Sequence, residues 1–167
     1  MSQTWRYDED RTYRGYRHSS GDLAIDIELA EYGPTHRQGV KVLRTLTSGT
    51  LFSKAQFGWG HKGGGANAAA HEILADAFGE PAPAKLRNAF SEDVLSQFST
   101  EWRLRRGAVL RWALGWGVQH GALRQLPAIL CSLPPVDAKR YGPRPQHVSD
   151  AWHSKFLGPN AKDIPSQ

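Results

Sequence analysis

A glycine-rich segment flanked by histidines is the part of the sequence best suited to chemistry. It reads HKGGGANAAAHE over residues 61–72, just before an alanine-rich run. Glycines ahead of a helix let the backbone approach a ligand closely, and the N-terminus of a helix favours negative charge. The segment therefore suggests a site for a phosphorylated ligand such as a nucleotide or an ADP-ribose-like molecule. Its candidate anion-binding residues are His61, Lys62, Gly63, Gly64, Gly65 and His71.

The known phosphate-binding signatures do not occur in this segment. In the Walker pattern a lysine and a Ser or Thr follow the glycines, whereas here Lys62 precedes them. In the dinucleotide fingerprint a third glycine is needed where Ala68 stands. The competing hypothesis is a structural turn that lets a helix pack closely. Its residues would be Trp59, Gly60 and Gly79, with Gly79 just past the helix end.

Metal chemistry and nucleophilic catalysis have little support in the sequence. Glu72 and Asp76 are four residues apart, but the zinc pattern H-E-x-x-H fails because Ala75 replaces the second histidine. A solvated polar helix face is the better interpretation of these acids. The single cysteine, Cys131, lies in an apolar run and resembles a small buried hydrophobe. We expect no metal and no cofactor, and catalytic residues remain unknown.

Aromatic and basic residues alternate in the second half of the chain. Such a mixture suits phosphate backbones and base stacking, and equally a protein interface in which Trp and Arg dominate the energy. The alternative is that the tryptophans lie in the core and the arginines on a solvated helix face. The candidate macromolecule-binding residues are Trp102, Arg103, Arg105, Arg106, Arg111, Lys139, Arg140 and Arg144.

Strand patterns come first along the chain and helix patterns follow. Strands are predicted at 12–17, 22–29 and 40–46, the second from strict alternation of Leu and Ile with other residues. Helices are predicted from about 65 to 78, over 84–98 and over 106–118, with a short extended piece or turn at 100–104. This order predicts an α+β fold, in which a small antiparallel sheet of about three strands, residues ~12–60, packs against three or more helices.

The domain organisation follows from the same patterns. We expect a flexible arm over residues 1–12 and an α+β domain over 13–118. Residues 119–167 form a C-terminal extension that either packs on the domain or trails from it.

Composition limits the compartment and the partners. No run of about 18 apolar residues and no secretory signal occurs, and one cysteine allows no internal disulfide. A cytoplasmic protein without membrane contact is expected. The net charge of +5 favours acidic partners, namely nucleic acid or an acidic protein surface, although a small basic protein can also simply be soluble.

The segment FGWGHKGGGANAAAHEILADAFG (57–79) resembles an uncharacterised family of phage and plasmid genomes, domain-of-unknown-function family 6166. The matching residues are Phe57, Trp59, Gly60, Gly63, Gly65, Ile73, Leu74 and Asp76. The resemblance spans residues 12–115, and the sequence departs from the pattern at His61 and over 64–66. It implies a mobile-element origin and a compact α+β fold, and it implies no activity.

Together these patterns predict a small accessory protein of a phage or mobile element that binds a macromolecule without catalysis. The partner would be nucleic acid or an acidic host protein, such as a component of a host defence complex. The alternative is an enzyme or sensor for a phosphorylated ligand at the turn 61–72.

Overall fold

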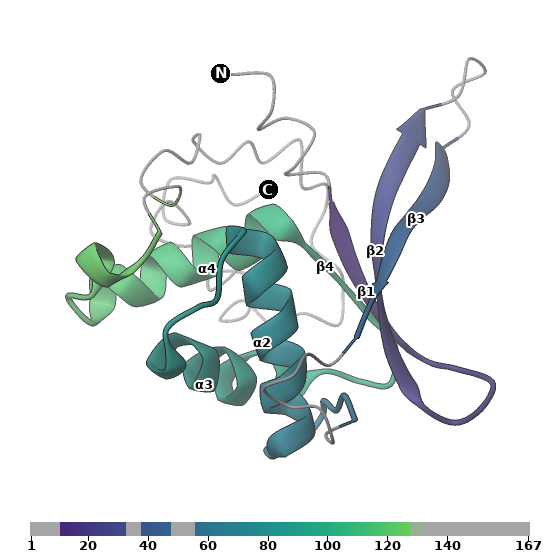
Figure 1. Cartoon of the computed structure of the whole chain (residues 1–167), viewed down its shortest axis with the longest axis horizontal. Coiled ribbons are helices and arrows are strands. Elements are labelled where there is room, and N and C mark those ends of the chain that lie inside the picture. The colour runs from purple at the N-terminus through teal and green to yellow at the C-terminus, as the bar shows by residue number, and fades with distance from the viewer. Residues whose placement is uncertain (1–10, 33–37, 48–55, 128–129, 131–167) are drawn as a thin grey trace, which may run out of the picture. The chain divides into compact units, whose positions relative to one another are not determined.

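The computed structural model describes residues 11–32, 38–47, 56–127 and 130 of the 167-residue chain (Figure 1). The chain divides into two compact units, residues 1–107 and 108–167, which are described in turn. The expected extension 119–167 is described only as far as residue 127, with residue 130. Cys131 and the candidate residues Lys139, Arg140 and Arg144 lie outside the described residues.

The first unit contains a four-stranded antiparallel sheet in the order β3-β2-β1-β4. Its strands are β1 (Thr12–Arg17), β2 (Leu23–Tyr32), β3 (Gln38–Leu46) and β4 (Trp102–Arg105). The α+β prediction is confirmed, with one strand more than expected. β4 is the short extended piece foreseen at 100–104, and it pairs with β1 at one edge of the sheet.

Alternation along β1, β2 and β4 gives this part of the sheet an apolar and a polar face. Tyr13, Ile25, Ile27 and Leu104 are buried on the first, which we call the inner face because Tyr13 hydrogen-bonds to α2. The other, outer face carries the side chains of intervening residues such as Arg14 and Asp26. A strand repeat of two residues produces this division.

A tryptophan on β4 explains the glycine in the middle of β1. Gly15 pairs with Trp102, and a Cβ atom at Gly15 would lie 2.1 Å from the indole ring. The missing side chain therefore makes room for the ring on the inner face. Trp102 also stacks on Phe98, with 4.8 Å between ring centroids.

Two helices and a 3₁₀ turn lie between β3 and β4 in the part of the first unit that the structure describes. α2 (Gly64–Phe78) is rich in alanine, and its buried side chains include Ala70, Ile73 and Leu74. It ends at Gly79, whose φ of 77° is the left-handed conformation that glycine favours at helix ends. α3 (Ala84–Asp93) follows, and the chain tightens into the 3₁₀ helix η2 (Leu95–Gln97). The single helix predicted over 84–98 is therefore wrong in its last turn.

The β2–β3 hairpin is longer than the rest of the sheet. β1 pairs with β2 only from Leu23 to Glu28, whereas β3 continues to pair with β2 as far as Tyr32. We call the two-stranded part beyond β1, residues 29–32 and 38–41, the β2–β3 ribbon (Figure 1). A bulge interrupts β3 at Leu43, because Ile27 pairs with Arg44 and Glu28 already pairs with Val42.

The second unit contains most of α4 (Arg106–Gln119), which starts at the end of the first unit, and the 3₁₀ helix η3 (Leu123–Gln125). Val109, Leu110 and Ala113 are buried. Gly117 lies against Leu123 and Leu126, and a Cβ atom at Gly117 would lie 2.6 Å from Leu126. None of the helices in the described ranges has the length and apolar character needed to cross a membrane.

Candidate functional site

A buried carboxylate on α2 connects the helix to two strands. The Asp76 side chain is 3% exposed and forms ion pairs with Arg11 and Arg44. Arg11 Nη1 lies 3.3 Å from Asp76 Oδ1, and Tyr13 Oη donates a hydrogen bond of 2.7 Å to Oδ2. These contacts contradict the solvated face predicted for Asp76. Arg11 belongs to the predicted flexible segment 1–12, whose last residue, Thr12, is the first residue of β1.

Two tyrosines have raised pKa values beside buried carboxylates. Burial raises the pKa of Tyr13 well above its ordinary value, and the negative charge of Asp76 adds to the effect. On the outer face, burial raises the pKa of Tyr16, and its hydrogen bond to Asp26 adds to this. Asp26 also accepts a 2.7 Å hydrogen bond from Thr45 Oγ1. Both carboxylates are therefore satisfied by neighbours in the sheet.

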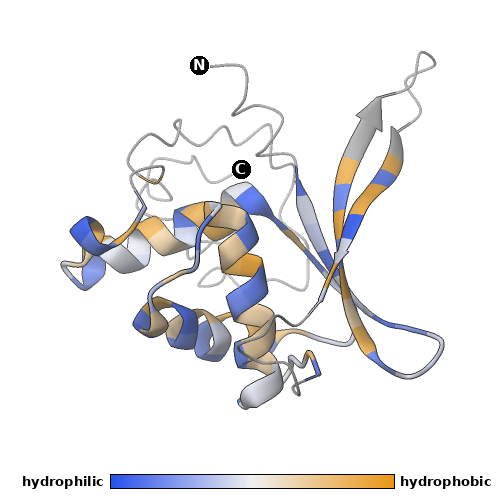
Figure 2. Ribbon diagram, in the orientation of Figure 1, coloured by the Kyte–Doolittle hydropathy of each residue, from blue (hydrophilic) through white to orange (hydrophobic). Residues whose placement is uncertain are grey.

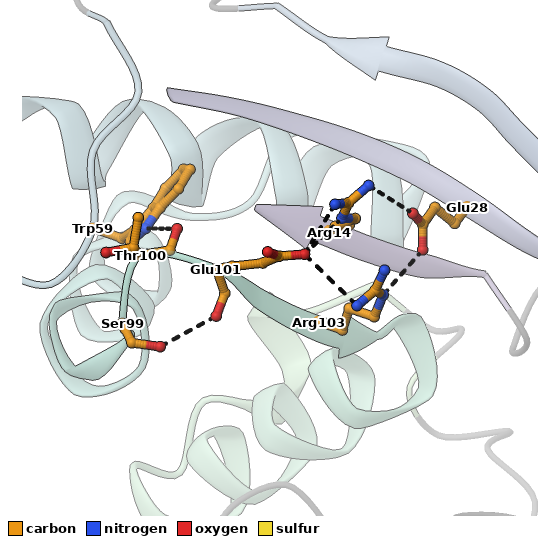
Figure 3. Close-up of polar contacts among 7 residues, drawn as sticks. All are labelled: Arg14, Glu28, Trp59, Ser99, Thr100, Glu101 and Arg103. Atoms are coloured by element: carbon orange, nitrogen blue, oxygen red, sulfur yellow. Dashed lines mark hydrogen bonds and ion pairs between the residues drawn. The ribbon is translucent and has the colours of Figure 1, made fainter. Parts of the chain in front are cut away.

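The outer face of the sheet carries a network of two arginines and two glutamates (Figure 3). Arg14 lies 2.9 Å from Glu101 and 3.8 Å from Glu28. Arg103 lies 3.4 Å from Glu28 and 3.8 Å from Glu101. The Glu28 side chain is 7% exposed, so these arginines compensate a carboxylate that would be costly to bury alone. The charges balance, which leaves this surface without a strong positive potential.

The glycine turn packs tightly against the segment that follows α3. Trp59 is buried, donates a 3.3 Å hydrogen bond to the carbonyl of Thr100, and meets Trp102 edge to face at 5.4 Å. The Gly60 N–H donates to the Leu95 carbonyl at 2.9 Å. A Cβ atom at Gly65 would lie 2.8 Å from the Gln56 carbonyl oxygen. Close backbone packing accounts for these residues.

Four of the candidate anion-binding residues, at positions 61–64, are exposed, whereas Gly65 and His71 are partly buried. Lys62 lies 3.8 Å from Glu92, and both side chains are largely exposed. No side chain caps the N-terminus of α2 at Gly63. His61 is exposed on the turn before α2, whereas His71 lies within α2, about 10 Å along the helix axis from Gly64 at ~1.5 Å per residue. Within the described ranges, no group of three or more His, Cys, Asp or Glu residues could hold a metal.

The candidate macromolecule-binding residues that the structure describes differ in exposure. Trp102 is buried on the inner face, whereas Arg103 and Arg105 are exposed. Arg106 is buried and donates a 2.9 Å hydrogen bond from Nε to the carbonyl of Ala77. Arg111 is buried in the second unit. The aromatic and basic side chains of this run therefore point to different environments.

The structure instead exposes apolar side chains on β3. Val40, Val42 and Leu43 are 61%, 49% and 42% exposed. β3 is an edge strand of the sheet, and no other described strand pairs with its outer edge. The pattern VKVLR predicts a strand, and Lys41 within it is a residue type typical of edge strands. We regard the exposed edge of β3 as the candidate functional site.

The comparisons with known proteins give a family and no activity. Residues 13–115, more than half of the chain, match the model described as Family of unknown function (DUF6166), and the chain belongs to this family. No curated protein and no solved structure matches the chain. The function must therefore be argued from the surface itself.

Proposed function

We propose that the protein is a non-catalytic binding protein that receives an extended segment of a partner protein along the open edge of β3. The phage or plasmid setting implied by the family resemblance, and a cytoplasmic location, belong to this proposal. One observation carries it: β3 is an edge strand with three exposed apolar side chains, Val40, Val42 and Leu43. An added strand would pair with the edge and cover these side chains.

The shape of the hairpin supports strand addition. Among the described residues, the two strands of the β2–β3 ribbon pair only with each other. An isolated two-stranded ribbon is marginally stable in water. A third strand on the β3 side would complete its backbone hydrogen bonds. Figure 2 shows hydrophobic and hydrophilic bands along the coloured part of this hairpin, which reflect the two-residue alternation of a strand.

Nucleic acid is the less favoured partner for this surface. Between Glu28 and Arg44 the chain has three Lys or Arg residues and two Glu residues, a net charge of +1. Phosphate backbones are bound through several uncompensated cations, and exposed valines contribute nothing to this electrostatic part of the affinity. Arg14 and Arg103, on the outer face of the sheet, are already paired with glutamates.

Nuclear magnetic resonance of the full chain tests this proposal directly. The probes are nine-residue extended peptides of varied charge, matching β3 in length, and a DNA duplex. We expect some of the peptides to shift the backbone amide resonances of residues 38–46 and to slow hydrogen exchange there. If no peptide affects β3, or if only the duplex does so with a steep dependence on salt, strand addition is wrong.

Two exposed valines provide a matched pair of variants. Val40→Ser removes an apolar contact from the proposed edge, whereas Val118→Ser changes a 52% exposed valine of α4. Peptide affinity should fall in the first variant and stay unchanged in the second. Equal affinities of the two variants would contradict a docking surface on β3.

A further inference from the structure

The two faces of β3 differ in chemistry, and from this difference we infer the sequence pattern of the partner. We propose that the partner strand alternates acidic and apolar residues, with its acidic side chains beside Lys41 on the inner face and its apolar ones beside Val40 and Val42 on the outer face. This inference rests on the proposed function. It adds the class of ligand that the edge selects.

The register of the sheet assigns each side chain of β3 to a face. Val40 and Val42 pair with Ala30 and Glu28, so they lie on the outer face. Lys41 pairs with Leu29 and lies on the inner face, as does Arg44, which pairs with Ile27. The bulge at Leu43 preserves this division, because it shifts Arg44 back to the inner face. One edge therefore offers apolar contacts on one side and cations on the other.

The two cations are not equally available to a partner. Arg44 forms an ion pair with Asp76, which neutralises part of its charge. Lys41 is exposed, and no ion pair joins it to any described residue. Opposite residues on adjacent strands have Cβ atoms about 5 Å apart, so a partner carboxylate next to Lys41 would lie within ion-pair reach. Lys41 is therefore the residue that determines charge specificity.

The same lysine explains why a second copy is a poor occupant of this edge. β3 carries Lys41 and Arg44 and no acidic residue, so two β3 strands side by side would bring like charges together. A lysine and a bulge are two devices by which proteins protect edge strands from self-pairing. An acidic partner strand turns the repulsive lysine into an attractive contact.

Two peptides of opposite charge test the inference on the full chain. Both have nine residues, with valine on alternate positions and either glutamate or lysine between them. We expect the glutamate peptide to bind at least about fivefold more tightly than the lysine peptide, since cross-strand ion pairs attract and like charges repel. Affinity is measured by fluorescence anisotropy and the binding site by amide resonance shifts.

Charge-reversal variants separate a local effect from the overall charge. Lys41→Glu should abolish or invert the preference for the glutamate peptide. Lys85→Glu, on the exposed surface of α3, makes the same change in net charge and should retain the preference for the glutamate peptide. If both peptides bind β3 equally, or if Lys41→Glu keeps the preference, the acidic pattern is wrong while strand addition stands. If neither peptide shifts β3, the proposed function itself fails.

Discussion

At the scale of single residues, Asp76 connects parts of the first unit that are far apart in sequence. Tyr13 and Arg11 lie 63 and 65 positions before it, and Arg44 lies 32 positions before it. A buried carboxylate costs several kcal/mol unless it is paired, so the two arginines and the tyrosine hydroxyl are needed together. The Arg44 contact also reaches the strand that we propose as the binding edge.

Tyr13 should make stability fall at high pH. Its pKa is raised above 10.0 in the folded protein by burial and by Asp76, so the folded state keeps a proton that the unfolded state loses. This contribution is fully present below pH 10.0 and is lost as the pH rises through the folded pKa. Between pH 10.0 and the folded pKa, the ionisation of Tyr13 lowers the free energy of unfolding by about 1.4 kcal/mol per pH unit.

A phenylalanine variant measures the contribution of Tyr13 ionisation to the fall in stability at high pH. Tyr13→Phe removes the ionisable group and one hydrogen bond, so it should cost about 1–2 kcal/mol near neutral pH and flatten the decline at alkaline pH. Urea unfolding across the alkaline range measures both effects. Tyr7→Phe changes a tyrosine outside the described residues and serves as the control for general tyrosine ionisation. An equally steep decline in Tyr13→Phe and in the unmodified protein would contradict the assignment.

The sequence could not reveal the role of Asp76 in advance. Helical spacing places it one turn after Glu72 on a polar face, which is why a solvated position was expected. Its partners come from strands whose positions relative to the helix are set by tertiary packing. The candidate site was missed for a related reason, since exposure of Val40 and Val42 depends on which strand lies at the edge.

At the scale of elements, the turn before α2 depends on two glycines packed against each other. A Cβ atom at Gly65 would lie 2.8 Å from the Gln56 carbonyl oxygen and 3.0 Å from the Gly58 nitrogen. Both neighbours are backbone atoms, which cannot move aside as a flexible side chain can. The N-terminal turn of α2 is therefore fixed against the preceding segment.

Two neighbouring glycines give a sharp test of this packing. Gly65→Ala should destabilise the protein by about 1–3 kcal/mol, as overpacking does in well-filled sites. Gly64→Ala is the control, because a Cβ atom there meets nothing within 4 Å and alanine favours the helix. It should be neutral or slightly stabilising. Equal midpoints of thermal unfolding for the two variants would show that the backbone contact is unimportant.

The order of elements was predictable, and their lateral arrangement was not. Alternation over residues 22–29 and the stripe containing Ile73 and Leu74 indicate a strand and a helix from local spacing alone. β4 has only four residues, and its place beside β1 depends on Trp102 packing over Gly15 from 87 positions away. Local patterns do not contain such pairings. The sequence therefore predicts the α+β class but does not determine which strands lie at the edges of the sheet.

At the scale of the whole molecule, a net charge of +5 and an open sheet edge have opposite effects on association. Net charge keeps copies apart, whereas unpaired strand edges bring them together. β3 is the place where the two effects meet, since Lys41 lies between two exposed valines. The protein can keep an edge open for a partner only if copies of the chain do not occupy it first.

Removing the lysine should therefore induce self-association. Lys41→Ile leaves four consecutive apolar residues at 40–43 on an open edge, a pattern that favours strand pairing between chains. Sedimentation velocity over a range of concentrations should show association of this variant and none of the unmodified chain. Lys85→Ile lowers the net charge from +5 to +4 in the same way but lies on α3, so it should remain unassociated. If the unmodified chain itself dimerises and Val40→Ser prevents this, the occupant of β3 is a second copy, and the proposal of an acidic partner strand fails.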